Sequence, residues 1–442
     1  MNKVDILFFS AFDHNEGHDS HGLFEMFKFF KNNLKYTSTY VNTMNSLYKN
    51  NIDVFDISGL GNNTHLFNQI TNSNYRENNP YSWKSLIKDK YKFIAAQVLI
   101  KVLPKHKFFV LIDRADIDFE ILEIILKHFK SKLLIISAVN NTWTGHCSYP
   151  AEFKCGLFKT QNGCDETCPA LNNRLNPKIV RETFDSTRKF LKNNSASVLL
   201  NVGNRFSLNE ATDSYLFKDI KKSLIPLKNL ECEENFQKLT KFKEKNRSNI
   251  VKEFNNIVKE DDILIMWSAY YIETKRKGFD FLMSALRNLK IDNPTSFEKV
   301  CLVICCNSIG SKYTSMLKEL NVKYIFAGFL KRKQYNFFAS GCDFYCCTTV
   351  SDAGPRTTYE SAAMATPVIS FDNCNSLDFV NSINGALIET YNIEQLANEI
   401  NRLVKINKKQ YAHMSKNIHD SYMRIMDTDT LISKWETFFD EN

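Results

Sequence analysis

The chain has 442 residues, 43% of them hydrophobic and 24% charged, with only 14 Gly and 9 Pro, which is the composition of an ordinary soluble globular protein of two to three domains. The formal net charge of +8 suits phosphorylated small molecules or an anionic membrane face, or simply gives a basic, soluble surface. The sequence gives no indication of nucleic-acid binding, because it has no long Lys/Arg run, no RNP-like aromatic signature and no zinc-finger spacing.

The first apolar run, "DILFFSAF" (residues 5–12), predicts a strand and not a signal peptide. Asp5 opens the run, and Asp13, His14 and Glu16 follow where a cleavage site would need small residues. The sequence has no uncharged apolar stretch of about 18 residues, so no membrane span is predicted. We therefore expect a cytoplasmic protein, with peripheral contact to the anionic cytoplasmic face of the inner membrane as a further prediction. In that reducing compartment most of the 12 cysteines should be free thiols.

Apolar runs alternate with amphipathic stretches of helical length, and this alternation predicts parallel sheets covered by helices. In the first half, the predicted strands are residues 5–12, 107–112, 132–139 and 196–202, and the predicted helices are residues 22–34 and 117–130. After a polar stretch at 228–260, the predicted strands are 262–268, 300–306, 324–330, 344–350 and 367–372, with a helix at 279–289. The expected fold class is α/β, with two doubly wound Rossmann-like domains facing a cleft. Ligands should bind beyond the carboxyl ends of the strands.

The segment "VSDAGPRTTYESAAMATPVISFD" (350–372) predicts a strand, a loop and a helix that begins at Pro355 and runs for about three turns. The first-turn amides near Thr357 and Thr358 would point at a ligand and offer the positive end of the helix dipole to a diphosphate. Glu360, one turn further in, could accept hydrogen bonds from two adjacent ribose hydroxyls. On the pattern alone, an acid pair with the spacing of Asp352 and Glu360 is more often two solvated side chains.

The stretch "TKRKGFDFL" (274–282) places cations after a predicted strand and before a helix that starts at a glycine. Such cations can neutralise a diphosphate leaving group, Arg through a bidentate fork and Lys as a point charge. Lys277 is the first candidate, Arg276 the second and Lys275 the third. A solvated basic loop is the alternative interpretation.

Asp352 and Glu360 together resemble the E-x7-E motif of the retaining GT-B glycosyltransferases of family 4, with Asp in place of the first Glu. The stretch "ESAAMATPVISFD" is similar to the family's EAmAcGtPVVafd, and "TKRKGFDFL" to its R/K-x-x-KG-x-d-x-L donor site. The resemblance implies that Glu360 holds the ribose of a nucleotide diphosphate sugar and that residues 352–354 contact the transferred sugar. It implies catalytic roles for Asp352, Lys277 and Arg276 without a catalytic metal or cofactor. The other donor-binding residues expected are Gly354, Pro355, Arg356, Thr357, Thr358 and Lys275.

The same resemblance implies a domain organisation. The stretch "SLIPLKNLECEENF" (223–236) is similar to the family's entry into the second domain. An acceptor-binding domain is therefore expected at 1–222 and a nucleotide-sugar-binding domain at 223–425. A helix at 426–442 should cross back to the first domain.

Four cysteines lie within 22 residues of each other, at Cys147, Cys155, Cys164 and Cys168. Four thiolates could close a structural zinc site; redox or disulfide pairing and unlinked thiols are the other interpretations. The stretch 142–172 resembles an insertion in a branch of family 4 similar to the colanic acid and surface-polysaccharide transferases. In that branch the insertion follows a His-Asp pair, and this chain has no His at residues 138–141.

The loop "DHNEGHDSHG" (13–22) follows the first predicted strand, where the family has a Gly-rich turn. Gly17 could let the backbone approach the donor phosphates. His18, Asp19 and His21 are candidates for acceptor contacts or general base chemistry, since imidazole titrates near neutral pH. A metal site and plain solvent contact are the alternatives for these polar side chains.

The sequence predicts a retaining, metal-independent glycosyltransferase that moves a sugar from a nucleotide diphosphate sugar to a hydroxyl of a glycan or lipid-linked glycan, in bacterial surface polysaccharide biosynthesis. Two alternatives stay open. One is a GT-B sugar-nucleotide epimerase. The other is a non-catalytic subunit that binds a nucleotide sugar or a glycan.

Overall fold

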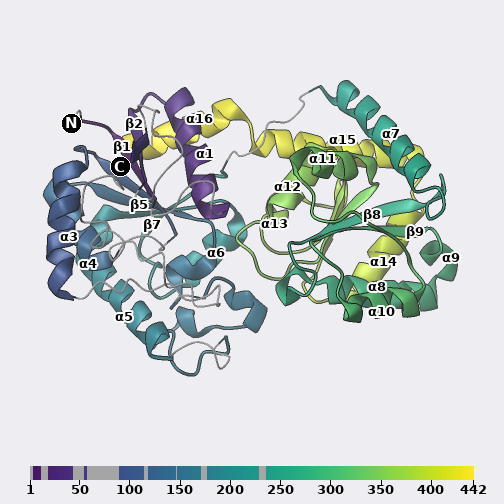
Figure 1. The fold of residues 1–442 in the computed structure, drawn as a ribbon, viewed down its shortest axis with the longest axis horizontal. Coiled ribbons are helices and arrows are strands. Elements are labelled where there is room, and N and C mark those ends of the chain that lie inside the picture. The colour runs from purple at the N-terminus through teal and green to yellow at the C-terminus, as the bar shows by residue number, and fades with distance from the viewer. Residues whose placement is uncertain are drawn as a thin grey trace. The chain divides into compact units, whose positions relative to one another are not determined.

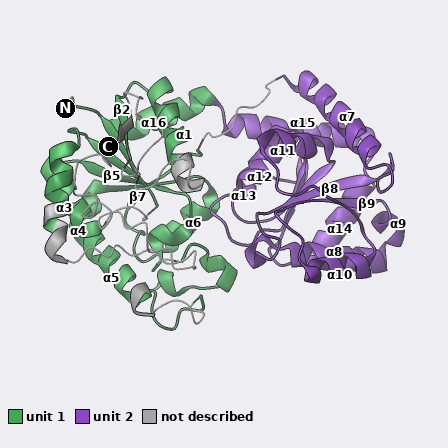
Figure 2. Ribbon diagram, viewed as in Figure 1, with its two compact units in different colours: residues 1–229, 428–442 green, residues 230–427 purple. Residues whose placement is uncertain are grey.

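A computed structural model of the chain describes residues 3–10, 18–42, 54–56, 89–113, 118–145, 147–170, 177–227 and 235–442. The chain forms two compact units (Figure 2). Unit 1 combines Met1–Asn229 with Thr428–Asn442, and unit 2 is Leu230–Asp427. Each unit is built on its own parallel sheet (Figure 1).

The sheet of unit 1 has the strand order β3-β2-β1-β4-β5-β6-β7, and every pairing in it is parallel. Its strands are β1 (Ile6–Ser10), β2 (Ser38–Asn42), β3 (Val54–Asp56), β4 (Phe108–Ile112), β5 (Lys132–Ser137), β6 (Val198–Val202) and β7 (Lys221–Leu224). The order reverses between β1 and β4, which is the doubly wound arrangement.

Helices cover both faces of this sheet because the strands are apolar on both faces. Ile6 and Phe8 of β1 belong to a core with α1 (His18–Asn33) and the C-terminal helix α16 (Thr428–Asp440). Leu7 and Phe9 point to the opposite core, which α3 (Asp89–Val102), α4 (Phe119–Phe129) and α5 (Pro177–Asn194) complete. The remaining elements of unit 1 are the 3-10 turns η1 (Asn140–Trp143), η2 (Pro150–Phe153), η3 (Leu157–Lys159) and η4 (Ser195–Ser197), and helix α6 (Arg205–Asp213).

The C-terminal helix α16 is an integral part of unit 1, where it lies beside α1 (Figure 1). The ring centroid of Trp435 is 4.9 Å from that of Phe30, and the ring of Phe439 is 4.8 Å from Phe108 of β4. Asp440 accepts hydrogen bonds from Lys35 at 2.7 Å and from Tyr36 at 2.5 Å. The last helix of the chain thus closes one face of the first sheet.

The sheet of unit 2 repeats the same topology, in the order β10-β9-β8-β11-β12-β13, again with parallel pairing throughout. Its strands are β8 (Ile263–Ser268), β9 (Val300–Cys305), β10 (Lys323–Phe326), β11 (Phe344–Cys347), β12 (Val368–Phe371) and β13 (Gly385–Ile388). The order reverses between β8 and β11, so these two adjacent strands flank the switch point.

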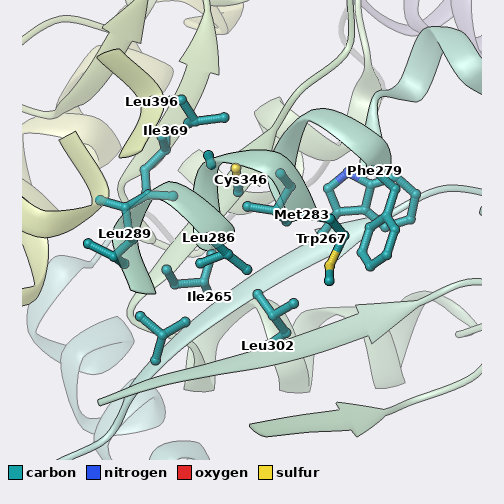
Figure 3. Packing of buried hydrophobic residues seen from close by; sticks show 14 of the residues in the cluster. Ile265, Trp267, Phe279, Met283, Leu286, Leu289, Leu302, Cys346, Ile369 and Leu396 are labelled. Carbon is teal, nitrogen blue, oxygen red and sulfur yellow. The ribbon is translucent and has the colours of Figure 1, made fainter. Parts of the chain in front are cut away.

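Alternate side chains of β8 enter the two cores of unit 2. Ile265 and Trp267 pack among α8 (Phe279–Asp292), α10 (Ser311–Leu320) and α14 (Ile393–Val404), and Figure 3 shows Trp267 beside Phe279 of α8. Leu264 and Met266 face α7 (Phe236–Glu253), α11 (Arg332–Gly341), α12 (Arg356–Ala363) and α15 (Lys408–Ile425). Two short helices, α9 (Pro294–Phe297) and α13 (Ser376–Phe379), and the 3-10 turn η5 (Lys275–Lys277) complete the unit.

The structure confirms the predicted α/β class with two doubly wound sheets. Within the described part of the chain, no helix combines the length and the apolar surface needed to cross a membrane. The cysteines predicted in buried strands are buried: Cys305 and Cys347 are at most 5% exposed. The predicted helix after residue 354 is shorter than expected, because Pro355 is its N-cap and Ala365, just after its end, has a φ of 55°.

Candidate functional site

Two loops of unit 2 leave the carboxyl ends of β8 and β11, the neighbouring strands at the switch point of the sheet. The loop after β8 carries η5, and the loop after β11 leads into α12. Ligands of doubly wound sheets bind at this place, because the loops from the two strands diverge there. The candidate site is therefore built on these two loops.

The cation loop after β8 is connected to the loop after β11 by hydrogen bonds to its main-chain carbonyl groups. Val350 N donates to the Arg276 carbonyl at 2.8 Å, and Thr348 Oγ1 donates to the Lys277 carbonyl at 3.0 Å. Gly278 ends the 3-10 turn at a φ of 74°, and a Cβ on it would lie 2.1 Å from the Thr348 carbonyl oxygen. Only glycine fits this close approach, which fixes the position of the cations.

Both cations converge on one acid. Asp352 Oδ2 lies 2.6 Å from Arg276 Nη1 and 2.7 Å from Lys277 Nζ, and the three side chains are between 15% and 18% exposed. Burial alone would raise the pKa of the Asp352 carboxyl. The charges of Lys277 and Arg276 and their hydrogen bonds outweigh burial and lower this pKa to about 2. Asp352 is thus ionised at neutral pH, while Lys275 is exposed beside the pair.

The turn before α12 is stabilised by hydrogen bonds within unit 2. Gly354 has a φ of 133° and donates its N–H to Asp352 Oδ1 at 3.3 Å. The Pro355 carbonyl accepts hydrogen bonds from Thr358 N at 3.2 Å and from Asn375 Nδ2 at 3.1 Å. Thr358 is fully buried, and its hydroxyl also contacts Asn375 Oδ1 at 2.9 Å. This differs from the expectation that the Thr358 amide faces a ligand, since the amide stabilises the turn.

Glu360 lies on the second turn of α12, and its side chain is 12% exposed. Its Oε1 is 3.3 Å from Nη1 of Arg332 on α11, whose side chain is 46% exposed. Arg356 begins the same helix and is half-buried. Both acids of the Asp352 and Glu360 pair therefore have a basic partner from another element.

Sequence reasoning missed the residues that hold Thr357. Tyr345 of β11 donates its hydroxyl to Thr357 Oγ1 at 2.6 Å, and the same hydroxyl is 3.0 Å from Ser268 Oγ at the end of β8. Tyr335 of α11 donates to the Thr357 carbonyl at 3.3 Å. The sequence predicts Tyr345 only as part of an apolar strand (344–350), and no pattern in the sequence marks its hydroxyl as a support for Thr357.

Three exposed aromatic side chains form a cluster after β8 and β10. Tyr270, Tyr271 and Phe329 are 50%, 52% and 58% exposed. The ring centroid of Tyr270 is 4.5 Å from that of Tyr271 and 5.3 Å from that of Phe329. Exposed aromatic rings offer faces on which a planar ring or the apolar face of a sugar can stack.

The candidates from the first loop belong to unit 1. Gly17 lies outside the described residues. His18, Asp19 and His21 are in the first turn of α1, directly after that undescribed stretch, and the structure describes only their backbone. They start the helix that follows β1, at the switch point of the first sheet.

The four clustered cysteines are free thiols in the loop region between β5 and α5. Cys164 and Cys168 are buried, and Gly145 donates its N–H to Cys164 Sγ at 3.1 Å. Burial raises the pKa of Cys147 to about 12, and a hydrogen bond with Cys168 raises the pKa of Cys155. Within the described ranges, no three His, Cys, Asp or Glu side chains are placed to hold a metal ion. A structural zinc ion at these four cysteines stays a prediction from the sequence.

Residues 248–420 match the family of glycosyl transferases group 1. The match contains the cation loop, Asp352, α12 and Glu360, and it supports a glycosyltransferase. No curated protein shows significant sequence similarity to the chain.

Solved structures share the fold over the whole chain. The HepE protein of Anabaena, in complex with UDP and glucose, has a TM-score of 0.59 at 11% identity, with coverage of 99% of this chain and 100% of that chain. A glycosyltransferase from Rickettsia africae has a TM-score of 0.63 at 16% identity, with coverage of 100% and 99%. The sucrose-phosphate synthase of Thermosynechococcus elongatus has a TM-score of 0.60 at 10% identity, with 99% of each chain covered. At these identities the likeness shows the GT-B fold.

Proposed function

We propose that the protein is a retaining glycosyltransferase that moves a sugar from a nucleotide diphosphate sugar to a hydroxyl of a glycan or lipid-linked glycan in bacterial surface polysaccharide biosynthesis. The observation that carries the proposal is the convergence of Arg276 and Lys277 on Asp352 at the switch point, within the segment that matches the glycosyl transferases. Structures of the HepE protein contain UDP or UDP-glucose, which supports a nucleoside diphosphate donor.

The cations supply the charge that such a transfer needs. When the bond from the sugar to the diphosphate breaks, negative charge develops on the departing phosphate oxygen. Arg276 and Lys277 are positioned to stabilise this charge, and the start of α12 adds the positive end of its dipole. Catalysis in this proposal consists of positioning and charge stabilisation, with no covalent nucleophile.

The remaining donor contacts follow from the same arrangement. Glu360 is proposed to accept hydrogen bonds from the ribose, and residues 352–357 to contact the diphosphate and the sugar. We place the nucleobase on the exposed rings of Tyr270, Tyr271 and Phe329, since these rings also lie after strand ends of unit 2.

The acceptor is proposed to use unit 1, through Gly17, His18, Asp19 and His21. Peripheral contact of the basic surface with an anionic membrane would bring a lipid-linked acceptor within reach, and the net charge of +8 supports this part of the proposal. No structural metal enters the proposed mechanism.

The test is transfer by the full-length chain from a panel of UDP-, GDP-, ADP- and TDP-sugars to oligosaccharide and lipid-linked acceptors. Mass spectrometry detects the product, and the anomeric configuration by NMR decides whether configuration is retained. Lys277→Ala and Glu360→Ala should each lower transfer by about 100-fold or more with an unchanged fold. Lys312→Ala, which removes an exposed charge of unit 2, and Glu399→Ala, which removes a half-buried one, serve as matched controls.

Three outcomes would contradict the proposal. Full activity of Glu360→Ala would remove the role of its carboxylate. Conversion of the donor without any acceptor would indicate an epimerase, and binding without turnover would indicate a non-catalytic subunit.

A further inference from the structure

The ion pairs of Asp352 have an uneven geometry. A single oxygen, Oδ2, contacts both Arg276 Nη1 at 2.6 Å and Lys277 Nζ at 2.7 Å. The other oxygen, Oδ1, accepts only a long hydrogen bond from Gly354 N at 3.3 Å within the described residues. The negative charge of the acid is therefore placed where the two cations converge.

The carboxylate oxygen Oδ2 of Asp352 makes the contacts that a phosphate oxygen of a ligand would make. Two basic side chains that share one anionic oxygen make the contact that they would make to a non-bridging oxygen of a diphosphate. The three side chains carry a net charge of one positive unit instead of the two that the cations have alone. Because the three side chains are largely buried, water screens this difference in net charge only weakly.

The main chain of Asp352 is anchored separately from its carboxylate. Its main chain lies against the thiol of Cys374, a residue that is 1% exposed and has a φ of 52°. Val350, two residues earlier, is bonded to the Arg276 carbonyl. A change in the contacts of the acid can therefore occur by side-chain rotation, while the loop stays in place.

From this geometry we propose that Asp352 is an internal counter-anion that competes with the diphosphate of the donor and of the nucleoside diphosphate product for Arg276 and Lys277. The inference rests on the proposed function, since it takes the two cations to be the diphosphate site. When a donor binds, the carboxylate rotates away from the cations. After transfer it returns, and it weakens the hold on a product that carries more negative charge than the intact donor.

The counter-anion explains why an acid is tolerated beside cations that must bind an anion. Without it, two largely buried cations would bind the charged product tightly, and product release would limit turnover. With it, diphosphate binding becomes an exchange of one anion for another. Asp352 thereby lowers the affinity for every diphosphate ligand, including those without a sugar or a base.

The experiment is calorimetric titration of the full-length chain and of Asp352→Asn with inorganic pyrophosphate and with UDP at constant ionic strength. Asn keeps the size of the side chain and removes its charge. We expect pyrophosphate to bind Asp352→Asn at least tenfold more tightly than the unchanged chain. Asp280→Asn, which removes an acid paired with exposed Lys312 in the same unit, should leave the affinity within twofold.

A second measurement covers the case in which Asp352→Asn is less stable. Pyrophosphate should then raise the melting temperature of the variant by more than that of the unchanged chain, because it restores an anion between the cations. Equal or weaker binding of pyrophosphate by Asp352→Asn, or no binding by either protein, would overturn the inference.

The outcome can be separated from that of the proposed function. Pyrophosphate binding requires no transfer, so tighter binding by Asp352→Asn without turnover of any donor would support the counter-anion and contradict the glycosyltransferase. Transfer by the unchanged chain, with pyrophosphate affinity unaffected by Asp352→Asn, would support the glycosyltransferase and contradict the counter-anion.

Discussion

The hydroxyl of Tyr345 donates a 2.6 Å hydrogen bond to Thr357 Oγ1, and so links strand β11 to the first turn of α12. Because the same hydroxyl is 3.0 Å from Ser268 Oγ, one phenol connects both strands at the switch point with the helix start. Tyr345 is 2% exposed, so these contacts are shielded from water. The helix start is therefore held in place before any ligand arrives.

We expect Tyr345→Phe to destabilise unit 2 by about 1 kcal/mol, which is the usual worth of one buried hydrogen bond. Donor KM should rise several-fold because Thr357 loses its support, while kcat changes less. Steady-state kinetics and thermal unfolding measure the two effects. Tyr313→Phe is the control, since its hydroxyl contacts Asp280. An unchanged KM in Tyr345→Phe would show that Thr357 does not need this contact.

Replacing Gly278 by Ala should be far more damaging than replacing Gly328 by Ala. The two glycines have φ values of 74° and 73°, but an added Cβ meets the Thr348 carbonyl oxygen at 2.1 Å only at Gly278, while Gly328 has open space. We expect a loss of about 1 kcal/mol for Gly328→Ala from backbone strain alone. Gly278→Ala should lose about 3 kcal/mol or more, because the loops must separate.

Denaturant unfolding and pyrophosphate titration of both variants check this prediction. Equal stability losses would mean that the loop relaxes around the added methyl group and that the cations are not held by the close approach.

The aromatic cluster should distinguish nucleotides from bare phosphates. Tyr270→Ala removes the central ring, which contacts both Tyr271 and Phe329. We expect the affinity for UDP to fall roughly tenfold, since stacking of one base is worth about 1–3 kcal/mol, while pyrophosphate affinity stays unchanged. A parallel loss for both ligands would contradict the placement of the base. Phe242→Ala, at another exposed aromatic residue of unit 2, is the matched control.

The stability of unit 1 should depend on pH through His106. This side chain is 2% exposed, and burial lowers its pKa from 6.5 to about 4, although a hydrogen bond to the Pro104 carbonyl acts in the other direction. Between these two pH values the unfolded chain binds a proton and the folded chain does not. Stability should therefore be highest above pH 6.5 and fall by about 3 kcal/mol as the pH drops to 4.

Hydrogen exchange of the β4 amides at pH values from 4 to 7.5 measures this fall. His106→Phe keeps a ring between Phe109 and Phe129, whose centroids are 5.5 Å and 4.7 Å away, and should flatten the pH dependence. If the pH dependence of stability persists in His106→Phe, it arises from other titratable groups.

The sequence predicted the apolar strands at the middle of each sheet well, and it missed strands with polar residues. A strand buried on both faces is a continuous apolar run, as in residues 262–268, which become β8. Strands β2 (Ser38–Asn42) and β7 (Lys221–Leu224) contain polar residues, and β7 lies at the sheet edge, so no apolar run marks them. Helix α7 was missed because the buried face that it presents includes Lys243 and Asn246 as well as Leu239 and Ile250.

At the site, the sequence identified residue types but not their partners. Arg276, Lys277, Asp352 and Glu360 were named from their spacing and their resemblance to a family. Spacing along the chain does not reveal that Asp352 faces the cations, because 75 residues separate it from Lys277 and only the sheet pairing of β8 with β11 brings them together.

The position of α16 has a consequence for the order in which the protein folds. Unit 1 includes residues on both sides of unit 2 in the sequence, and its core around Phe30 needs Trp435 and Phe439. During synthesis, unit 2 emerges complete while one apolar face of the first sheet still lacks its cover. At typical translation rates of about 5–20 residues per second, that face stays uncovered for on the order of 10 to 40 seconds. Unit 1 is therefore synthesised first for the most part but completes its fold after unit 2. It is the unit that would need a chaperone.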